Sequence, residues 1–329
     1  MIQAFVNTEK GIRNINSLEV SRLPKDAVWL DLLDPDPEEE AAVESFLRID
    51  VPSEEEIVEI EDSSRFYQRK DNVYVTATVL SRLETGRISD TDVRFALTPK
   101  TLVSIRYEDS RPFRLFSGRL LRDSSESESS DSIMEKMLEM IVDDMADILE
   151  RIALDVDELS HKIFFSRRTG NMESDAASEI SLHDVIKYLG RYGEQVSEIR
   201  LSILNMNRLL IFLSQCGEKW WRTETRSRLQ TLIRDVRSLT EHAAFLANRV
   251  SFMLDGVLGM INIEQNNIIK IFSVAAVVFL PPTLIASIYG MNFRSMPELS
   301  WDFGYPVAIL LMIISALLPY SFFKRKGWL

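Results

Sequence analysis

The sequence predicts an α+β domain that faces water, followed by a long α-helical stalk and two membrane-spanning helices. Two segments near the C-terminus, Ile271–Ile288 and Gly304–Phe323, contain 18 and 20 residues and no Asp, Glu, Lys, Arg or His. An uncharged apolar run of about 20 residues is long enough to cross a bilayer as a helix. The residues before them are charged and mix strand and helix patterns. We therefore expect a membrane protein with a large water-facing body.

Residues 1–120 have the pattern of a mixed α/β domain. Four segments are rich in β-branched and apolar residues and predict strands: 27–32, 73–80, 93–97 and 101–106. The last two flank Thr98-Pro99-Lys100, which predicts a hairpin between them.

The acidic run Asp34–Glu40 could bind a metal ion, but a helix start explains it better. Asp36 can cap a helix, Pro37 suits the first helical position, and the glutamates that follow complement the positive end of the helix dipole. Ser53–Glu56 has the same capping-box pattern. We therefore expect caps, not metal ligands, at both places.

Long helices are expected after a polar break at residues 121–131. Residues 132–165 have helical spacing with many acids, and residues 174–216 form a second long helical pattern. From Trp220 no proline occurs until Pro281, so one helix of about 90 Å, at ~1.5 Å per residue, is expected to run into the first apolar segment.

The charge of the chain is unevenly distributed. Residues 266–329 carry five basic and two acidic groups, a net +3, so the first 265 residues must carry −15 for the chain to total −12. An acidic body repels nucleic acid and attracts cations. There is one cysteine, Cys216, the three histidines are scattered, and no GxxxxGK[ST] or GxGxxG motif occurs. We therefore expect neither an enzyme nor a nucleotide-driven pump.

The flanking charges predict the orientation of the two spans. Lys324, Arg325 and Lys326 follow the second span directly, which places the C-terminus in the cytoplasm by the positive-inside rule. Two crossings then return the acidic body to the same side. Only residues 291–303 are expected to face outward, and they include Glu298, which could concentrate cations or be a solvated loop acid.

Polar and small residues align on one face of the first span. Steps of seven give the rows Asn266, Ser273, Leu280, Ser287 and Ile269, Ala276, Thr283, Gly290. Such a face can pack against another helix, or it can line a water-filled path. Two helices cannot enclose a path, so the second interpretation requires several chains. Pro281-Pro282 leaves backbone carbonyls free in mid-span, which favours a neighbouring protein or water.

The segment after the first span predicts a cation site. We expect Gly290 to end the helix in a left-handed turn. Several copies would gather carbonyl oxygens and the Asn292 amides in a ring at the negative end of the helix dipole. Magnesium sheds its water reluctantly, and neutral oxygens can hold its hydration shell without trapping the ion.

The sequence of this region resembles the CorA magnesium and cobalt transporter family, and is similar to its enterobacterial-type members. The resemblance is carried by Tyr289-Gly290-Met291-Asn292-Phe293, by Met296-Pro297-Glu298-Leu299, by the stretch 261–283 and by the basic end 323–329. It is specific over residues 255–329, whereas over residues 1–250 it is one of organisation.

The resemblance implies a funnel-shaped homopentamer whose first membrane helix lines the pore. It implies an outer cation-binding ring of Gly290, Met291 and Asn292, polar rings at Thr283 and Asn266, and a hydrophobic constriction of Leu280, Phe272 and Ile269. The expected pore-lining positions are Asn266, Ile269, Phe272, Ser273, Ala276, Leu280, Thr283 and Ser287. We expect Lys324, Arg325 and Lys326 to form a basic ring near the pore entrance, and Asp235 and Asp255 are candidates for a regulatory metal.

These expectations divide the chain into seven segments. They are 1–130, a cytoplasmic α/β domain; 131–218, long acidic helices; 219–267, the stalk; 268–290, the pore-lining span; 291–303, the periplasmic loop; 304–323, the second span; and 324–329, the basic C-terminus.

The expected function is a divalent-cation channel of the bacterial inner membrane with both termini in the cytoplasm. It would take up Mg²⁺, with Co²⁺ and Ni²⁺ as further substrates, driven by the membrane potential and gated by cytoplasmic Mg²⁺. Its expected partners are copies of itself and membrane lipid, with no nucleotide, nucleic acid or covalent cofactor. The alternatives are a zinc transporter of the same superfamily and a membrane scaffold that transports nothing.

Overall fold

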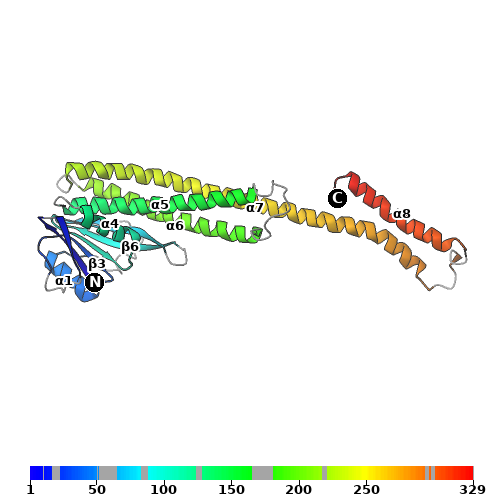
Figure 1. The fold of residues 1–329 in the computed structure, drawn as a ribbon, viewed down its shortest axis with the longest axis horizontal. Helices are drawn as coiled ribbons and strands as arrows, with labels where there is room; N and C mark the ends of the chain where they lie inside the picture. Colours follow the sequence, from blue (N-terminus) through cyan, green and yellow to red (C-terminus); the bar gives the residue numbers. More distant parts are fainter. Residues whose placement is uncertain are drawn as a thin grey trace. The chain divides into compact units, whose positions relative to one another are not determined.

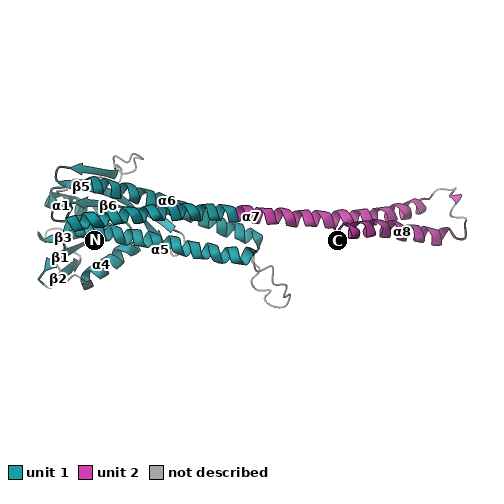
Figure 2. Cartoon of the chain, turned by 90° about the horizontal axis from the view of Figure 1, so that it is seen from above, with its two compact units in different colours: residues 1–253 teal, residues 254–329 magenta. Residues whose placement is uncertain are grey.

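The structure is a computed structural model that describes residues 1–9, 11–16, 23–49, 51, 65–82, 88–123, 128–164, 181–216, 221–292, 296–297 and 301–328. The chain forms two compact units, Met1–Met253 and Leu254–Leu329 (Figure 2). The expected capping box at Ser53–Glu56 and the loop residue Glu298 lie outside the described residues.

Unit 1 contains a seven-stranded mixed sheet in the order β2-β1-β3-β7-β6-β5-β4. Its strands are β1 Ile2–Thr8, β2 Gly11–Asn16, β3 Ala27–Leu33, β4 Phe66–Arg69, β5 Asn72–Arg82, β6 Ile88–Leu97 and β7 Leu102–Arg106. β3 and β7 pair in parallel, and the other neighbours are antiparallel. The predicted hairpin is confirmed, because β6 pairs with β7 and Leu97 lies opposite Leu102.

The described helices are α1 Pro37–Leu47, α4 Arg111–Asp123, α5 Ser130–Phe164, α6 Leu182–Gln215, α7 Thr223–Tyr289 and α8 Gly304–Arg325 (Figure 1). The predicted fold class, an α+β domain with long helices and two apolar C-terminal helices, is confirmed for a single chain. The expected helix into the first span is one unbroken helix of 67 residues. The division into seven segments stays a prediction, because compactness separates only two units.

The expected cap at Asp36 is confirmed. Its side chain accepts a hydrogen bond from the N–H of Glu39 at 2.8 Å, and the Glu39 side chain accepts one from the N–H of Asp36. Pro37 begins α1. The acidic run therefore satisfies the free N–H groups at a helix start, as a capping box does.

The polar break expected at residues 121–131 is shorter than predicted, because α4 extends to Asp123 and α5 begins at Ser130. Phe113, Phe116 and Leu120 of α4 are buried at helical spacing. Phe113 and Phe116 contact Trp29 of β3, with ring centroids 6.4 and 5.4 Å apart. Burial of these aromatic rings, more than helix propensity, explains the helix that the sequence reading missed.

A buried ion pair joins β3 to β7. Asp31 and Arg106 are 2% and 4% exposed, and the Arg106 guanidinium donates Nη2–H to Asp31 Oδ2 at 2.8 Å. Ser104 donates to the other carboxylate oxygen at 2.7 Å, and Trp29 donates to Ser104. Buried charges are tolerated when they are paired and hydrogen-bonded in this way.

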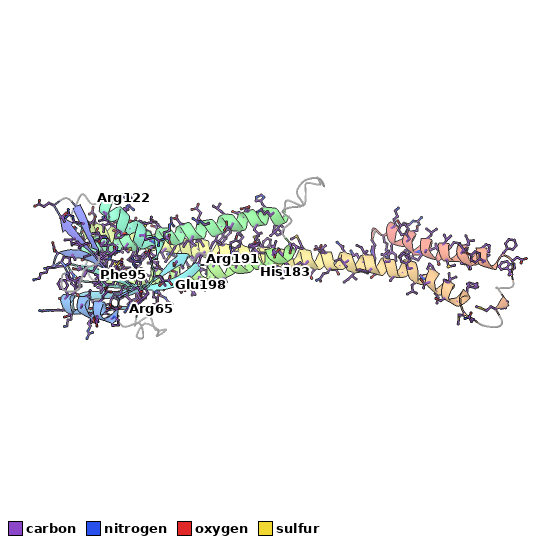
Figure 3. All side chains as sticks on the ribbon, turned by 60° about the horizontal axis from the view of Figure 1, so that its bottom comes forward. Arg65, Phe95, Arg122, His183, Arg191 and Glu198 are labelled. Atoms are coloured by element: carbon purple, nitrogen blue, oxygen red, sulfur yellow. The ribbon has the colours of Figure 1, made fainter. Side chains whose placement is uncertain are left out.

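Helix α6 covers part of the free edge of β5. β4 pairs only with Asn72–Val75, so among the described residues the rest of β5 has no strand partner on that side. Asn205 of α6 accepts from the N–H of Thr78 at 3.0 Å, and Ser202 donates to the carbonyl of Thr78 at 2.6 Å. Arg65, labelled in Figure 3, donates to the Thr78 hydroxyl. These side chains satisfy backbone groups that an open sheet edge would leave exposed.

Unit 2 consists of the end of α7 and of α8, which lie side by side (Figures 1 and 2). Both helices are long and apolar enough to span a membrane, and only 6% of each apolar segment is buried in the chain. A core helix of a soluble protein would be mostly buried. The exposure of both helices therefore favours spans that face lipid or other copies.

Candidate functional site

The expected pore-lining residues share an exposed face of α7. All eight are exposed in the single chain: Asn266, Ile269, Phe272, Ser273, Ala276, Leu280, Thr283 and Ser287. The three large apolar ones are among the most exposed, at 61% for Ile269, 71% for Phe272 and 65% for Leu280. No residue in the described part of the chain covers this mixed polar and apolar face.

The opposite face of α7 is the one that packs inside the chain. Val274 is 4% exposed, and Val278 and Ile285, which follow at helical spacing, are half-buried. At about 100° per residue, these positions lie roughly half a turn from the candidate face. In α8, Ala308 is buried, at 7%. The polar rows are therefore not used for packing α7 against the second span of the same chain, so a helix that packs on them would have to belong to another copy.

Mid-span, the backbone of α7 has free acceptors. Pro281 and Pro282 lack an N–H, so the carbonyls of Val277 and Val278 have no donor four residues ahead. The hydroxyl of Thr283 donates to the carbonyl of Phe279 at 2.8 Å, which leaves the Thr283 oxygen able to accept. Helix α7 nevertheless remains continuous from Thr223 to Tyr289.

Gly290 ends α7, but not in the expected left-handed turn. Among the described glycines, only Gly11 and Gly327 have positive φ, so that prediction is wrong. The N–H of Gly290 donates to the carbonyl of Ala286 at 2.9 Å, which continues the helical pattern by one residue. A Cβ at Gly290 would lie 3.1 Å from that same carbonyl oxygen. Close approach to a backbone carbonyl, not handedness, is therefore what favours glycine here. Met291 and Asn292 follow and are exposed.

The two candidate regulatory carboxylates are both exposed on α7, Asp235 in unit 1 and Asp255 in unit 2. Asp143 of α5 faces the same acidic surroundings as Asp235. Partial removal from water raises the pKa of the Asp143 carboxyl, and the charges of Glu139, Asp147 and Asp235 raise it further. Among the residues that the structure describes, no group of three or more His, Cys, Asp or Glu side chains is arranged to hold a metal ion. A regulatory metal at Asp235 or Asp255 stays a prediction.

The three basic residues Lys324, Arg325 and Lys326 are exposed at the end of α8. A ring of such residues requires several copies of the chain. The basic ring near a pore entrance therefore also stays a prediction.

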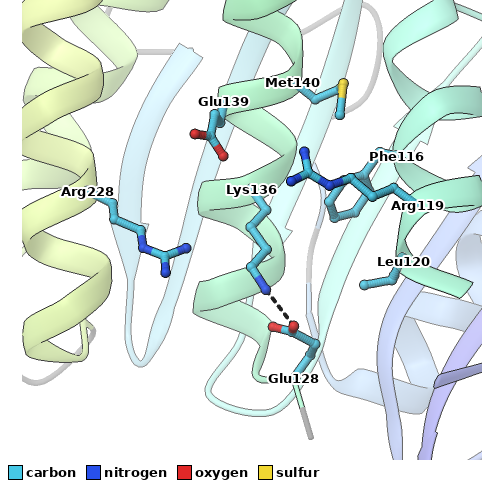
Figure 4. A pocket seen from close by; sticks show the side chains of 8 residues that line it. All are labelled: Phe116, Arg119, Leu120, Glu128, Lys136, Glu139, Met140 and Arg228. Atoms are coloured by element: carbon cyan, nitrogen blue, oxygen red, sulfur yellow. Dashed lines mark hydrogen bonds and ion pairs between the residues drawn. The ribbon is translucent and has the colours of Figure 1, made fainter. Parts of the chain in front are cut away.

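A separate cavity of about 170 Å³ lies in unit 1 between α4, α5 and α7 (Figure 4). Its lining is Phe116, Arg119, Leu120, Glu128, Lys136, Glu139, Met140 and Arg228. Lys136 pairs with Glu128, and Arg228 lies 3.8 Å from Glu135. Lys136 and Arg228 therefore each have a carboxylate as a neighbour. None of the expected pore residues lines this cavity.

Glu135 is a buried carboxyl that the sequence reading missed. It is 3% exposed and has a core position on α5, where buried residues recur in steps of three and four, such as Asp131, Leu138 and Val142. Burial raises the pKa of Glu135 to about 7, although the positive charge of Arg228 opposes the shift. The signal that could have located it is an acid in register with an apolar stripe.

Comparisons with known proteins cover the whole chain. A family model described as CorA-like Mg²⁺ transporter protein matches residues 24–325. The magnesium transport protein CorA of Salmonella typhimurium is 34% identical over 329 residues, which is 100% of both chains. The solved structure of the CorA magnesium transporter from Methanocaldococcus jannaschii has a TM-score of 0.77 at 19% identity, covering 100% of this chain and 99% of that one. The cytoplasmic domain of ZntB from Vibrio parahaemolyticus has a TM-score of 0.58 at 13% identity, covering 79% and 97%.

We predict that Glu135 makes the stability of unit 1 depend on pH. Because the folded carboxyl has a pKa of about 7, above its ordinary value of 4.5, the folded state keeps a proton that the unfolded state has lost. The associated stability is fully present below pH 4.5 and is lost as the pH rises through 7, with a size of about 3 kcal/mol. Thermal unfolding of the detergent-solubilised chain between pH 5 and pH 8 measures it.

Glu135→Gln should flatten this pH dependence. Glu150→Gln, which removes an exposed carboxylate of the same helix, should leave it as in the unmodified chain. Equal pH profiles for all three proteins would contradict the assignment to Glu135.

Proposed function

Because the chain belongs to the family of CorA-like Mg²⁺ transporter proteins, we propose that it moves Mg²⁺ through a water-filled path lined by α7. Magnesium transport itself follows from the family and from the full-length relatives. The proposal concerns the route, its selectivity and its control.

The proposal rests on the exposed face of α7. Polar side chains in a membrane helix avoid lipid and face protein or water. In this chain they face away from α8, and two helices cannot enclose a path by themselves. Several copies that gather these faces around one axis would bury all eight positions at once. We infer a homopentamer, as the family resemblance implies, with α7 innermost.

The outer end of the path is assigned to Gly290, Met291 and Asn292. Their backbone carbonyls and the Asn292 amide supply neutral oxygens, which suit an ion that keeps its hydration shell. Asn266 and Thr283 would form further polar rings. Between them, Ile269, Phe272 and Leu280 would form an apolar constriction that closes when it loses water.

The membrane potential is sufficient as the driving force. At ~2.3 kcal/mol per charge for each 100 mV, a divalent cation gains about 4.6 kcal/mol on crossing inward. No nucleotide is then required. The basic residues at the end of α8 support a cytoplasmic location of both termini. The family resemblance supports the bacterial inner membrane as the location.

The range of transported ions is part of the proposal. Co²⁺ and Ni²⁺ are the further substrates that the resemblance implies. The similarity to the ZntB domain concerns the fold alone, at 13% identity, so zinc is the weaker assignment. A scaffold without transport does not agree with the family.

Replacing Asn292 tests the outer ring. We expect Asn292→Ala to lower Mg²⁺ flux into liposomes with a negative interior at least tenfold, or to remove the preference for Mg²⁺ over Co²⁺, because one ring of amide oxygens is lost. Asn267→Ala, the same change at an exposed position outside the polar rows, is the matched control. Unchanged flux and selectivity in Asn292→Ala would rule out the assigned ring.

The neighbouring residues Asn266 and Asn267 test which face of α7 lines the path. Both are exposed asparagines of one helix, but they point about 100° apart, and only Asn266 is in the polar rows. Asn266→Ala should reduce Mg²⁺ flux several-fold, while Asn267→Ala should not. Flux measured with a Mg²⁺-sensitive dye inside liposomes gives the comparison. The reverse result would place another face of α7 on the path.

Cytoplasmic Mg²⁺ should close the path. The first 265 residues carry −15, and copies of such a body repel one another unless cations screen them. We expect flux to fall several-fold as Mg²⁺ on the side of unit 1 rises from micromolar to millimolar concentration. The measurement requires vesicles with unit 1 facing the bath, and flux that ignores Mg²⁺ on that side would contradict this form of control.

A further inference from the structure

The C-terminal end of α8 has a rigid geometry set by a left-handed glycine. Gly327 has a φ of +68°, in the left-handed region. Its N–H donates to the carbonyl of Lys324 at 3.2 Å, and the N–H of Trp328 donates to the carbonyl of Phe323 at 3.1 Å. These two bonds and the left-handed glycine form a Schellman motif, which ends the helix and turns the chain back on it.

The turn fixes an aromatic group at the helix end. The ring of Trp328 packs against Phe323, with centroids 5.3 Å apart, as the apolar contact of a Schellman motif does. The ammonium of Lys326 lies over the ring of Phe322, 5.1 Å from its centroid. Trp328 is still 41% exposed. Its indole thus has an apolar side held by the helix and an edge open to the surroundings, which is the arrangement that tryptophan adopts at membrane interfaces.

Three cations surround this turn. Lys324, Arg325 and Lys326 are consecutive and exposed. Among the residues that the structure describes, no carboxylate forms an ion pair with any of them. Lys324 and Arg325 are the last two residues of α8, an apolar helix that begins at Gly304, and Lys326 follows them. All three therefore lie where a spanning helix leaves the hydrocarbon layer. At that depth a bilayer offers the phosphodiesters of its headgroups as negatively charged partners.

We propose that Lys324, Arg325, Lys326 and Trp328 form a binding site for the headgroup of an anionic phospholipid. Arg325 would hold the phosphodiester with two parallel N–H donors, and the two lysines would add point charges. Trp328 would lie at the boundary between headgroup and acyl chains. Gly327 keeps all four side chains on one short turn. The site rests on the membrane placement of α8 and not on the residues of α7 that line the proposed path. It is an alternative to the expected basic ring near the pore entrance, because it directs the same three cations toward lipid.

The site predicts preference for a charged headgroup. The full chain, delipidated in a nonionic detergent, is titrated with phosphatidylglycerol or with phosphatidylcholine of the same acyl chains, and bound lipid is counted by native mass spectrometry. We expect phosphatidylglycerol to bind more tightly. Each cation near a membrane surface contributes about a fivefold effect, so the change of all three to Gln should weaken phosphatidylglycerol binding on the order of a hundredfold.

Two further variants distinguish a specific binding site from a general electrostatic attraction between the chain and anionic lipid. The triple change Lys162→Gln, Lys187→Gln and Arg200→Gln removes the same charge from exposed positions of unit 1 and should leave lipid binding unchanged. Gly327→Ala keeps every charge but strains the turn, and it should weaken phosphatidylglycerol binding several-fold. Equal binding of the two lipids, an equal loss in the control triple variant, or no effect of Gly327→Ala would overturn the proposal.

Free phosphate is the remaining alternative ligand. Inorganic phosphate at millimolar concentration should not displace phosphatidylglycerol, because the apolar contacts of Trp328 require the acyl-chain boundary. Displacement would show a site for free anions and would also overturn the lipid assignment. Mg²⁺ flux in liposomes of phosphatidylcholine alone tests the ion path separately.

Discussion

The arrangement of α7 and α8 is the constraint on which the function of this chain depends. Two helices cannot surround a channel, so a single chain has to present to other copies the surface that an ion would meet. The pairing of α7 with α8 uses the face around Val274 and leaves the rows of Asn266 and Thr283 bare. A face that mixes amides, hydroxyls and large apolar side chains suits neither lipid nor water. A shared interior would be its stable place, and this requirement supports the proposed oligomer.

The sequence was sufficient where a local rule or a long pattern decides the structure. The cap at Asp36, the hairpin around Pro99 and the continuity of α7 all follow from residues close together in the chain. Features set by distant contacts could not be predicted. Helix α4 depends on the burial of its aromatic rings against Trp29. Glu135 was not singled out from the sequence, because an acid on a long acidic helix shows its burial only through the elements that pack on that helix. Gly290 was assigned the wrong role, because sequence alone does not distinguish a glycine required by handedness from one required by a close carbonyl.

Helix α7 takes part both in the repulsion between carboxylates of unit 1 and in the candidate path. Asp143 resists ionisation partly because Asp235 of α7 lies near it. The same uninterrupted helix carries Asp235 and, about 30 residues further along the chain, Asn266 at the start of the first polar row. A cation that relieves this repulsion would therefore favour one position of α7 over another. Such a differential effect is what coupling between a regulatory ligand and a distant gate requires.

In the proposed path, the residues that would select the ion differ from the residues that would close the path. A carboxylate ring would attract a hydrated divalent cation strongly, but it would also slow its release, whereas amide, hydroxyl and carbonyl oxygens exchange hydrogen bonds with the hydration shell at lower cost. Rings at Asn292, Thr283 and Asn266 would each offer such oxygens. The apolar side chains between them cannot replace lost water, so a small decrease in diameter would empty that stretch and stop the ion. The apolar constriction and the rings at Thr283 and Asn266 lie on one helix, so a modest tilt of α7 would change the diameter of the path at the apolar stretch. A helix that carries its own selective and closing elements explains why two spans per chain are enough.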